Sequence, residues 1–203
     1  MITEQDVRRN FTITGSFNIK NDIIDVEGTV MLGTTTIRLV REIIPEILLP
    51  FGNVTGDFIC QGVDLTSLVN SPKKVGGSFF CNSNKLVTLK GAPESVGDGF
   101  YCDGNKLTTL EGSPIKVGGY FNCVVNRLKT LKGCPKSVGT FYCDWSKKLP
   151  LLSLIKYNKI LINKNEVVEQ IMKQYAGKKP LRQAIIQCQR ELIDAGFPDN
   201  ARL

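Results

Sequence analysis

The chain has 203 residues, of which 42% are hydrophobic and 22% charged, with a formal net charge of +7 and no histidine. These fractions exclude a globally disordered chain, and no apolar run approaches the ~20 residues of a membrane-spanning helix. The missing histidine excludes Ser-His-Asp and Cys-His catalysis and any imidazole-bound metal ion. The polar first ten residues do not resemble a signal peptide, so we expect a protein of the cytoplasm.

Residues 1–53 are expected to form an N-terminal cap. Apolar and polar side chains alternate over residues 11–19 and 23–26, which predicts two short strands joined by a turn at residues 20–22. This segment carries 5 Lys and Arg against 7 Asp and Glu, whereas the rest of the chain is basic.

The same segment contains one degenerate coil with a long outer arc. Three of its apolar residues stand 28 positions before core positions of the next coil: Leu32, Ile37 and Val40. Residues 41–49 are predicted to form a helical turn, which Pro50 stops.

Residues 54–152 contain five copies of a 21-residue repeat. Two leucine positions, a valine, a proline and a cysteine recur with this step, and one unit runs Asn84-Lys-Leu86-x-Thr-Leu89-x-Gly91-x-Pro93-x-x-Val96-Gly97-x-x-Phe100-x-Cys102. The periodic cysteines are Cys60, Cys81, Cys102 and Cys123, with Cys143 one residue early. Such phase over five copies indicates a solenoid, in which each coil depends on its neighbours for a core.

Each repeat position has a physical role. Phe-x-Cys alternates with period two, so both side chains point inward from a short strand while the residue between them points outward. The Asn of Asn-x-Leu can bond the backbone where the chain leaves the strand. The sequence therefore predicts an α/β solenoid with a parallel sheet, one short strand per 21-residue coil, an irregular N-terminal β cap and a C-terminal helical cap.

The Phe/Leu-x-Cys/Leu-x-x-Asn-x-Leu pattern resembles the leucine-rich repeat, and its 21-residue length is similar to the short bacterial class. More closely, Asn-x-Leu-x-Thr-Leu-x-Gly-x-Pro-x-x-Val-Gly-Gly-x-Phe-x-Cys resembles repeat proteins encoded by large tailed phages. The resemblance is tight over residues 54–152. It implies the fold and a phage origin, and it brings no catalytic residue with it.

Residues 153–203 lose the 21-residue phase and are expected to be helical. Asn163-x-x-Glu166 is typical of a helix start and Gly177 of a helix end. Pro180 suits the first turn of a second helix, which Gly196 ends. Its apolar stripe consists of Leu181, Ile185, Cys188 and Leu192. We expect a lid on the last coil; the alternative is a separate pair of partner-binding helices.

The chemistry-bearing residues do not form a catalytic or metal-binding pattern. Five of the 7 cysteines share one inward position, no Cys-x-x-Cys occurs, and cysteine there acts as a small apolar residue. We therefore expect reduced thiols, no disulfide, no metal, no cofactor and no enzyme activity. The competing possibility is an enzyme assembled from Asp and Lys side chains of the inner face.

The outward face of the predicted sheet is unusual, because several aromatic rings occupy positions that normally carry small polar or charged side chains. Aromatic rings of this kind are typical of binding interfaces. The predicted partner-binding residues are Ile59, Phe80, Tyr101, Tyr120, Asn122, Tyr142, Trp145, Asp103 and Asp144. The alternative is cross-strand packing that only stabilises the sheet.

A basic residue follows the repeat Asn in four coils. This candidate stripe for an acidic partner consists of Lys85, Lys106, Arg127 and Lys148. Stacked like charges cost stability, which favours a functional reading, but lysine-rich turns are also common.

Together these features predict a non-enzymatic, protein-binding solenoid that grips a host or phage protein through its sheet face, for example to inhibit host defence. The first alternative is a minor structural or assembly component of a virion. The weaker alternative is nucleic-acid binding through the basic stripe.

Overall fold

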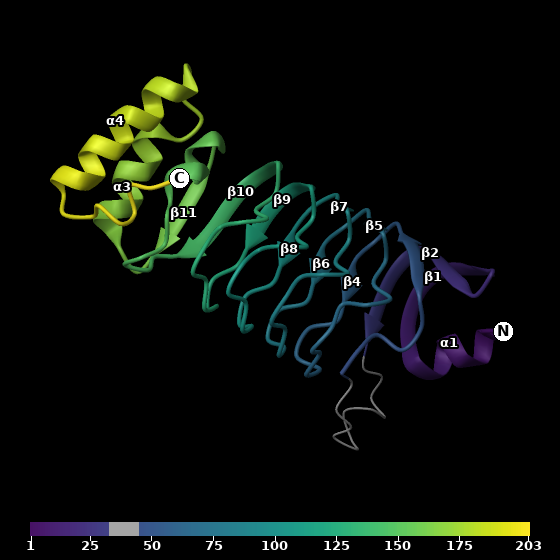
Figure 1. Cartoon of the computed structure of the whole chain (residues 1–203). Coiled ribbons are helices and arrows are strands. Elements are labelled where there is room, and N and C mark those ends of the chain that lie inside the picture. Colours follow the sequence, from purple (N-terminus) through teal and green to yellow (C-terminus); the bar gives the residue numbers. More distant parts are fainter. Residues whose placement is uncertain (33–44) are drawn as a thin grey trace.

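The computed structural model describes residues 1–32 and 45–203. It shows a parallel β-solenoid of about five coils with a hairpin at its N-terminal end and helices at its C-terminal end (Figure 1). The solenoid class, the parallel sheet and the C-terminal helical cap predicted from the repeat are confirmed.

The N-terminal cap consists of a helix and an antiparallel hairpin. Helix α1 (Glu4–Asn10) precedes strand β1 (Phe11–Lys20), which pairs along its whole length with β2 (Ile23–Leu32). The two predicted strands are therefore present, and both are longer than expected. The helix was not predicted, although Thr3 and Asp6 form a reciprocal capping box at its start.

The first, irregular coil joins this cap to the regular coils. Strand β2 pairs in parallel with β4 (Phe58–Ile59), so that Val30 lies opposite Phe58. This pairing has the 28-residue offset predicted for Leu32, which is buried. The predicted coil residues Ile37 and Val40, and residues 41–44 of the predicted helical turn, lie outside the described residues. The described part of that turn, residues 45–49, contains bends and no helix.

Each early coil carries two short strands, where the sequence predicted one. The first column contains β3 (Phe51–Val54), β5 (Lys74–Val75) and β7 (Ser95–Val96); the second contains β4, β6 (Phe79–Phe80) and β8 (Phe100–Tyr101). Both columns meet β2 at one end and β9 (Lys116–Asn122) at the other. In β9 and in β10 (Ser137–Asp144) the two segments form one continuous strand.

The glycines between the two segments explain the extra column. A Cβ atom on Gly97 would lie 1.9 Å from the carbonyl oxygen of Gly76 in the preceding coil, and one on Gly118 equally close to that of Gly97. Only glycine allows the backbones of neighbouring coils to approach so closely. The valine before each glycine is thereby held in a second β-ladder rather than in a turn.

A column of buried phenylalanine rings runs through the core. Neighbouring rings are nearly parallel, with centroids 5.5, 5.4, 5.4 and 5.2 Å apart. The column consists of Phe58, Phe79, Phe100, Phe121 and Phe141. Phe51 extends it at the N-terminal end and Tyr157 at the C-terminal end. Since each ring contacts the next coil, the core of one coil is completed by its neighbours.

The periodic cysteines lie inward, beside the phenylalanines. The thiols of Cys81 and Cys102 donate hydrogen bonds of 3.3 Å to the backbone carbonyls of Tyr101 and Asn122 in the following coil. Burial raises the pKa of the Cys60 and Cys102 thiols well above their usual range, and that of Cys143 to about 12. These side chains are therefore neutral and structural.

The asparagine after each strand joins two coils. The side chain of Asn105 accepts a hydrogen bond from the Leu86 N–H and donates to the carbonyls of Cys81 and Cys102. Asn84 and Asn126 repeat this arrangement. The backbone bonding predicted for this position is confirmed, and it also connects neighbouring coils.

The C-terminal cap contains more structure than two helices. A 3₁₀ helix (Leu152–Lys156) is followed by β11 (Ile160–Asn163), which adds a further parallel strand to β10 and was not predicted. Helix α3 (Glu166–Tyr175) packs beside β11, and helix α4 (Leu181–Asp194) packs on α3.

Side chains at the start of α3 close the edge of the sheet. The N-cap is Asn165, which corrects the helix start predicted at Asn163, because Asn163 still belongs to the strand. Glu169 accepts a hydrogen bond of 3.0 Å from the Ile162 N–H. The helical lid therefore shields this edge from pairing with another strand.

Candidate functional site

Seven strands place one outward side chain each in a continuous line across the outer face of the sheet. Strand pairing aligns these positions in succession. We name them the outer row: Met31, Ile59, Phe80, Tyr101, Asn122, Tyr142 and Leu161. Neighbouring strands lie about 4.8 Å apart, so the row is about 29 Å long. Five predicted site residues therefore belong to it; Met31 and Leu161 were missed, because their strands lie outside the regular repeats.

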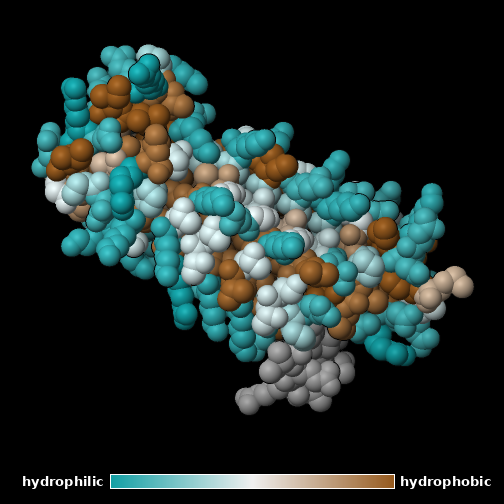
Figure 2. Space-filling view, viewed as in Figure 1, coloured by the Kyte–Doolittle hydropathy of each residue, from teal (hydrophilic) through white to brown (hydrophobic). Residues whose placement is uncertain are grey.

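The rings of Phe80 and Tyr101 stack at the centre of the row. Their centroids are 4.8 Å apart and their planes differ by 3°. Gly99 leaves room for the Tyr101 ring, since a Cβ atom there would lie 2.4 Å from it. Both rings are half-buried, so part of each stabilises the sheet and part remains exposed. Figure 2 shows hydrophilic side chains along the rims of the solenoid and hydrophobic ones gathered between them.

Asn122 interrupts the line of rings. Its amide nitrogen donates a hydrogen bond of 3.1 Å to the Asp103 carboxylate, and its oxygen accepts one from the Val124 N–H. The preceding side chain on the same face, Tyr120, is 49% exposed. The structure thus brings together Tyr101, Asn122, Asp103 and Tyr120, all predicted as site residues.

Carboxylates surround the central tyrosine. Burial raises the pKa of Tyr101, and the neighbouring Asp98, Tyr120 and Asp103 raise it further. Burial likewise raises the pKa of Asp103. Among the described residues, no Lys or Arg forms an ion pair with Asp57, Asp98 or Asp103. The outer face therefore has an acidic centre, although the chain as a whole is basic. Asp98 was not predicted as a site residue.

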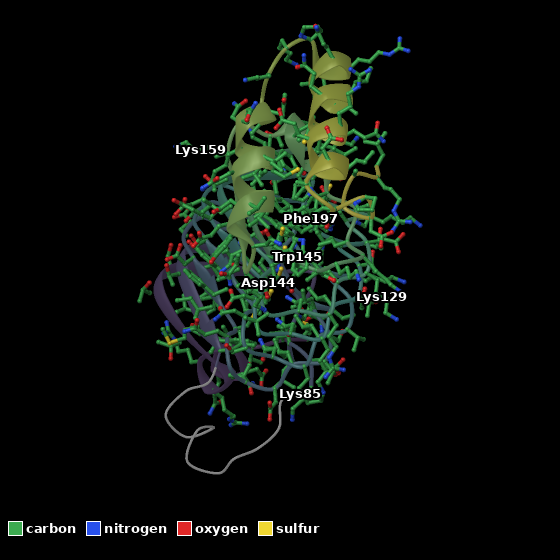
Figure 3. The ribbon with its side chains drawn as sticks, turned by 90° about the vertical axis from the view of Figure 1, so that its left-hand side faces the viewer. Lys85, Lys129, Asp144, Trp145, Lys159 and Phe197 are labelled. Carbon is green, nitrogen blue, oxygen red and sulfur yellow. The ribbon has the colours of Figure 1, made fainter. Side chains whose placement is uncertain are left out.

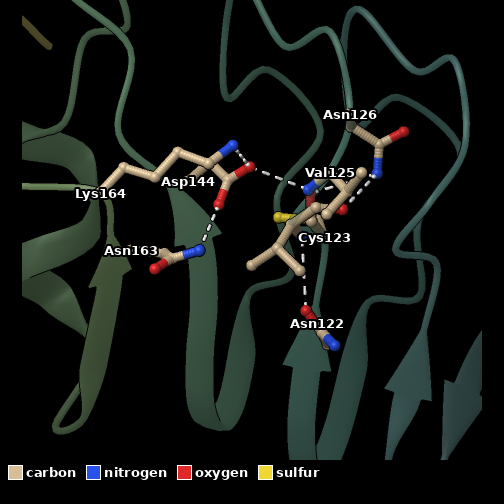
Figure 4. Close-up of polar contacts among 8 residues, drawn as sticks. Asn122, Cys123, Val125, Asn126, Asp144, Asn163 and Lys164 are labelled. Atoms are coloured by element: carbon tan, nitrogen blue, oxygen red, sulfur yellow. Dashed lines mark hydrogen bonds and ion pairs between the residues drawn. The ribbon is translucent and has the colours of Figure 1, made fainter.

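Asp144, by contrast, is fully engaged within the protein (Figure 4). It accepts hydrogen bonds from the Val125 N–H at 3.0 Å, from Asn163 at 3.0 Å and from the Lys164 ammonium group at 2.5 Å. Burial opposes ionisation of Asp144, but these donors outweigh it and lower its pKa. Asp144 thus links the last coil to β11, which leaves it little capacity to contact a partner.

Trp145 lies close to Phe197 of the C-terminal segment (Figure 3). Its ring makes an edge contact with Phe197, with centroids 6.2 Å apart. Its indole N–H donates to the side chain of Asn200, which is itself buried and bonds the carbonyls of Ser146 and Leu149. The structure therefore packs Trp145 against the C-terminal cap, away from the aromatic side chains of the outer row.

Because the chain has 1 Trp, its fluorescence should report on this cap. Replacing Asn200 by Ala removes the acceptor of the indole N–H and leaves two carbonyls without a donor, so we expect a loss of about 2–3 kcal/mol of stability and a red-shifted emission maximum. Asp199→Ala, at a partly exposed neighbouring position, removes only a surface ion pair with Arg202; it is the control and should leave the emission unchanged. Equal spectra for the wild type and both variants would show that the segment does not hold Trp145.

A hollow of about 680 Å³ adjoins the C-terminal end of the outer row. Tyr142 and Leu161 form one side, and Glu166 and Glu169 of α3 form another. A partner lying along the row could therefore extend beside this helix. A smaller hollow of about 340 Å³ contains Arg127 and Lys129 together with Trp145.

The predicted basic stripe is exposed and regular. The backbone N–H groups of Lys85, Lys106 and Arg127 each donate to a leucine carbonyl of the preceding coil, so these residues occupy equivalent positions. Lys148, the fourth member, is exposed as well. Lys85 forms an ion pair of 3.0 Å with Asp64, which reduces the net charge at one end of the stripe.

Within residues 1–32 and 45–203, no group of three or more acidic or cysteine side chains is arranged to hold a metal ion. None of the helices in this part of the chain is both long and apolar enough to cross a membrane. Comparison with protein-family models, curated proteins and solved structures found no match. The function is therefore inferred from the surface chemistry of the chain itself.

Proposed function

We propose that this chain is a non-enzymatic scaffold that binds another protein through the outer row. The observation that supports the proposal most is the continuous line of large side chains on a rigid sheet, centred on the stacked rings of Phe80 and Tyr101. Half-buried rings bury much area in a complex and lose little conformational entropy, because the sheet already orders them.

The buried thiols agree with a scaffold rather than with an enzyme. A cysteine nucleophile needs a depressed pKa, whereas burial raises the pKa of Cys60, Cys102 and Cys188. Asp98 and Asp103 lie beside a tyrosine and an amide, and among the described residues neither forms an ion pair with a Lys or Arg that could assist proton transfer. These features support binding as the main activity.

The resemblance of the repeats to phage-encoded proteins supports a partner from the host or from the phage. Under this proposal the solenoid acts on a soluble host protein, for example a component of host defence. A role in virion assembly would use the same face against a capsid or tail protein. Purified particles and infected-cell extracts distinguish these two sources of the partner.

The outer row can be tested by removing its rings. We expect the triple variant Phe80→Ser, Tyr101→Ser, Tyr142→Ser to lose at least tenfold in partner capture. Each half-buried ring contributes about 1–2 kcal/mol, so the unfolding midpoint should fall by roughly 6–24 °C, and capture is compared at a temperature at which the variant is folded. Capture is measured by affinity purification with the full chain, followed by mass spectrometry, and folding is checked by circular dichroism.

A matched control changes three exposed apolar side chains outside the row. Val69, Val87 and Ile115 are 51%, 58% and 55% exposed, and their replacement by Ser should leave capture unchanged. The proposal is wrong if the triple variant folds and still captures the partner. In that case the C-terminal helices become the better candidate.

A further inference from the structure

We infer that the interruption of the outer row at Asn122 receives an arginine side chain of the bound protein. This inference rests on the proposed function. It names the chemical group of the partner that contacts the middle of the outer row. It follows from the spacing of the rings, the charge around them and the remaining acceptor capacity of two carboxylates.

The spacing provides a place for one flat group. Asn122 lies between Tyr101 and Tyr142 in the register of the sheet, so the two tyrosines are two strand spacings, or about 10 Å, apart. A planar group stacks on a ring at about 3.5–4.0 Å. The Phe80–Tyr101 pair shows that adjacent coils already place rings at stacking distance. Asn122 carries no ring of its own, so a flat group of the partner that lies over its amide would have a tyrosine on the strand to either side.

Asn122 itself is partly exposed on the solvent side of the sheet. The Asn122 amide is held by Asp103 and by the Val124 N–H, at the end of the strand. Tyr120, the side chain before it on the same face, is exposed. The site thus presents three tyrosines around an amide that is already bonded.

The negative charge of the carboxylates around Asn122 favours a cationic side chain of the partner at this place. Asp98 and Asp103 lie close enough to Tyr101 to raise its pKa, and neither forms an ion pair with a described Lys or Arg. Asp103 accepts a hydrogen bond from Asn122 and Asp98 one from the Ser78 hydroxyl at 3.1 Å; a carboxylate has about four lone-pair sites, so each keeps acceptor capacity for an incoming donor. In a chain with a net charge of +7, two unpaired carboxylates beside exposed rings are complementary to a basic group and repel a phosphate.

Arginine fits better than lysine. Its guanidinium group is planar, is weakly hydrated, stacks on aromatic faces and carries five donors in a fixed fork. One edge can bond the Asp103 carboxylate while the plane contacts the tyrosine rings. An ammonium group offers the charge without the flat surface.

The test uses the full chain and needs no knowledge of the partner. N-acetyl-arginine amide is titrated into the isotope-labelled protein while the signals of Tyr101, Tyr120 and Asn122 are followed by NMR. Saturable shifts confined to this part of the outer face are expected. N-acetyl-citrulline amide, which has nearly the same shape without the charge, should bind at least tenfold more weakly.

Two charge-removing variants and one control complete the design. Asp103→Asn should weaken arginine binding about tenfold, and Asp98→Asn, at an exposed position, provides a second variant if the first perturbs the fold. Asp64→Asn removes a carboxylate from a turn outside the row and should change nothing. Equal binding of the arginine and citrulline amides, or binding unaffected by both outer-face variants, would overturn the inference.

The two proposals fail in different ways. If the titration fails while the triple ring variant still abolishes capture, the outer row binds a protein without an arginine at Asn122. If capture survives the triple variant, the proposed function and this inference are both wrong. Arginine binding with the expected charge dependence, together with loss of capture, supports both.

Discussion

Replacing Phe100 by Ala is expected to lower the free energy of unfolding by about 4 kcal/mol. The side chain is fully buried, and its ring contacts those of Phe79 and Phe121 at centroid distances of 5.4 Å on both sides. The substitution therefore removes apolar contacts within one coil and also at two interfaces between coils. Phe100 belongs to the middle of the column, where no cap can move in to fill the space.

Urea unfolding followed by circular dichroism measures this effect, and the adjacent residue provides a control. Tyr101→Ala removes a ring of similar size from the same short strand, but this ring is only half-buried and points outward. We expect it to cost about 1–2 kcal/mol. If both variants unfold with the same free energy, the phenylalanine column is not the main source of cohesion between coils.

The regular part of the fold could be predicted because its sequence period equals the length of one coil. A residue repeated every 21 positions must meet its own copy in the next coil, so inward Phe and Cys and the bonded Asn follow directly from the spacing. The second strand column was missed because Val-Gly usually marks a turn. Only the close approach of Gly97 to Gly76 shows that the backbone remains extended there.

The ends were harder to predict, because they have no copies to compare. Strand β11 has the buried residues Ile160 and Ile162 but only four residues, and a short apolar run does not distinguish strand from helix. The partners of Trp145 lie more than 50 residues further along the chain, at Phe197 and Asn200. No local pattern connects them, so sequence spacing placed Trp145 on the sheet face.

The candidate site was predictable in its outward positions and not in its electrostatics. Alternation placed Phe80, Tyr101 and Tyr142 on one face, as the strand pairing shows. It could not distinguish Asp103, which forms no ion pair within the described part of the chain, from Asp144, which accepts hydrogen bonds from Lys164 and two other donors. That difference depends on β11, whose presence the repeat did not indicate.

Replacing Asn105 by Ala should cost about as much as removing a core ring, although the side chain is polar. The residue is 7% exposed, and its amide serves the Leu86 N–H and the carbonyls of Cys81 and Cys102. Each buried backbone group left without a partner costs about 1–3 kcal/mol, so we expect a loss of about 4 kcal/mol.

The matched variant Asn82→Ala tests whether the loss of stability comes from the missing hydrogen bonds to the backbone or from the removal of an asparagine side chain as such. Asn82 belongs to the same coil boundary, but its side-chain oxygen has no hydrogen-bond partner in the described structure, so its replacement should cost under about 1 kcal/mol. Asn105→Asp should cost at least as much as Asn105→Ala, because the carboxylate can accept from Leu86 but is buried without a cation and faces the oxygens of two carbonyls. Chemical denaturation of the three variants gives the order directly. Equal costs for Asn82→Ala and Asn105→Ala would mean that water satisfies the freed backbone groups, and that the coils are joined by their apolar columns alone.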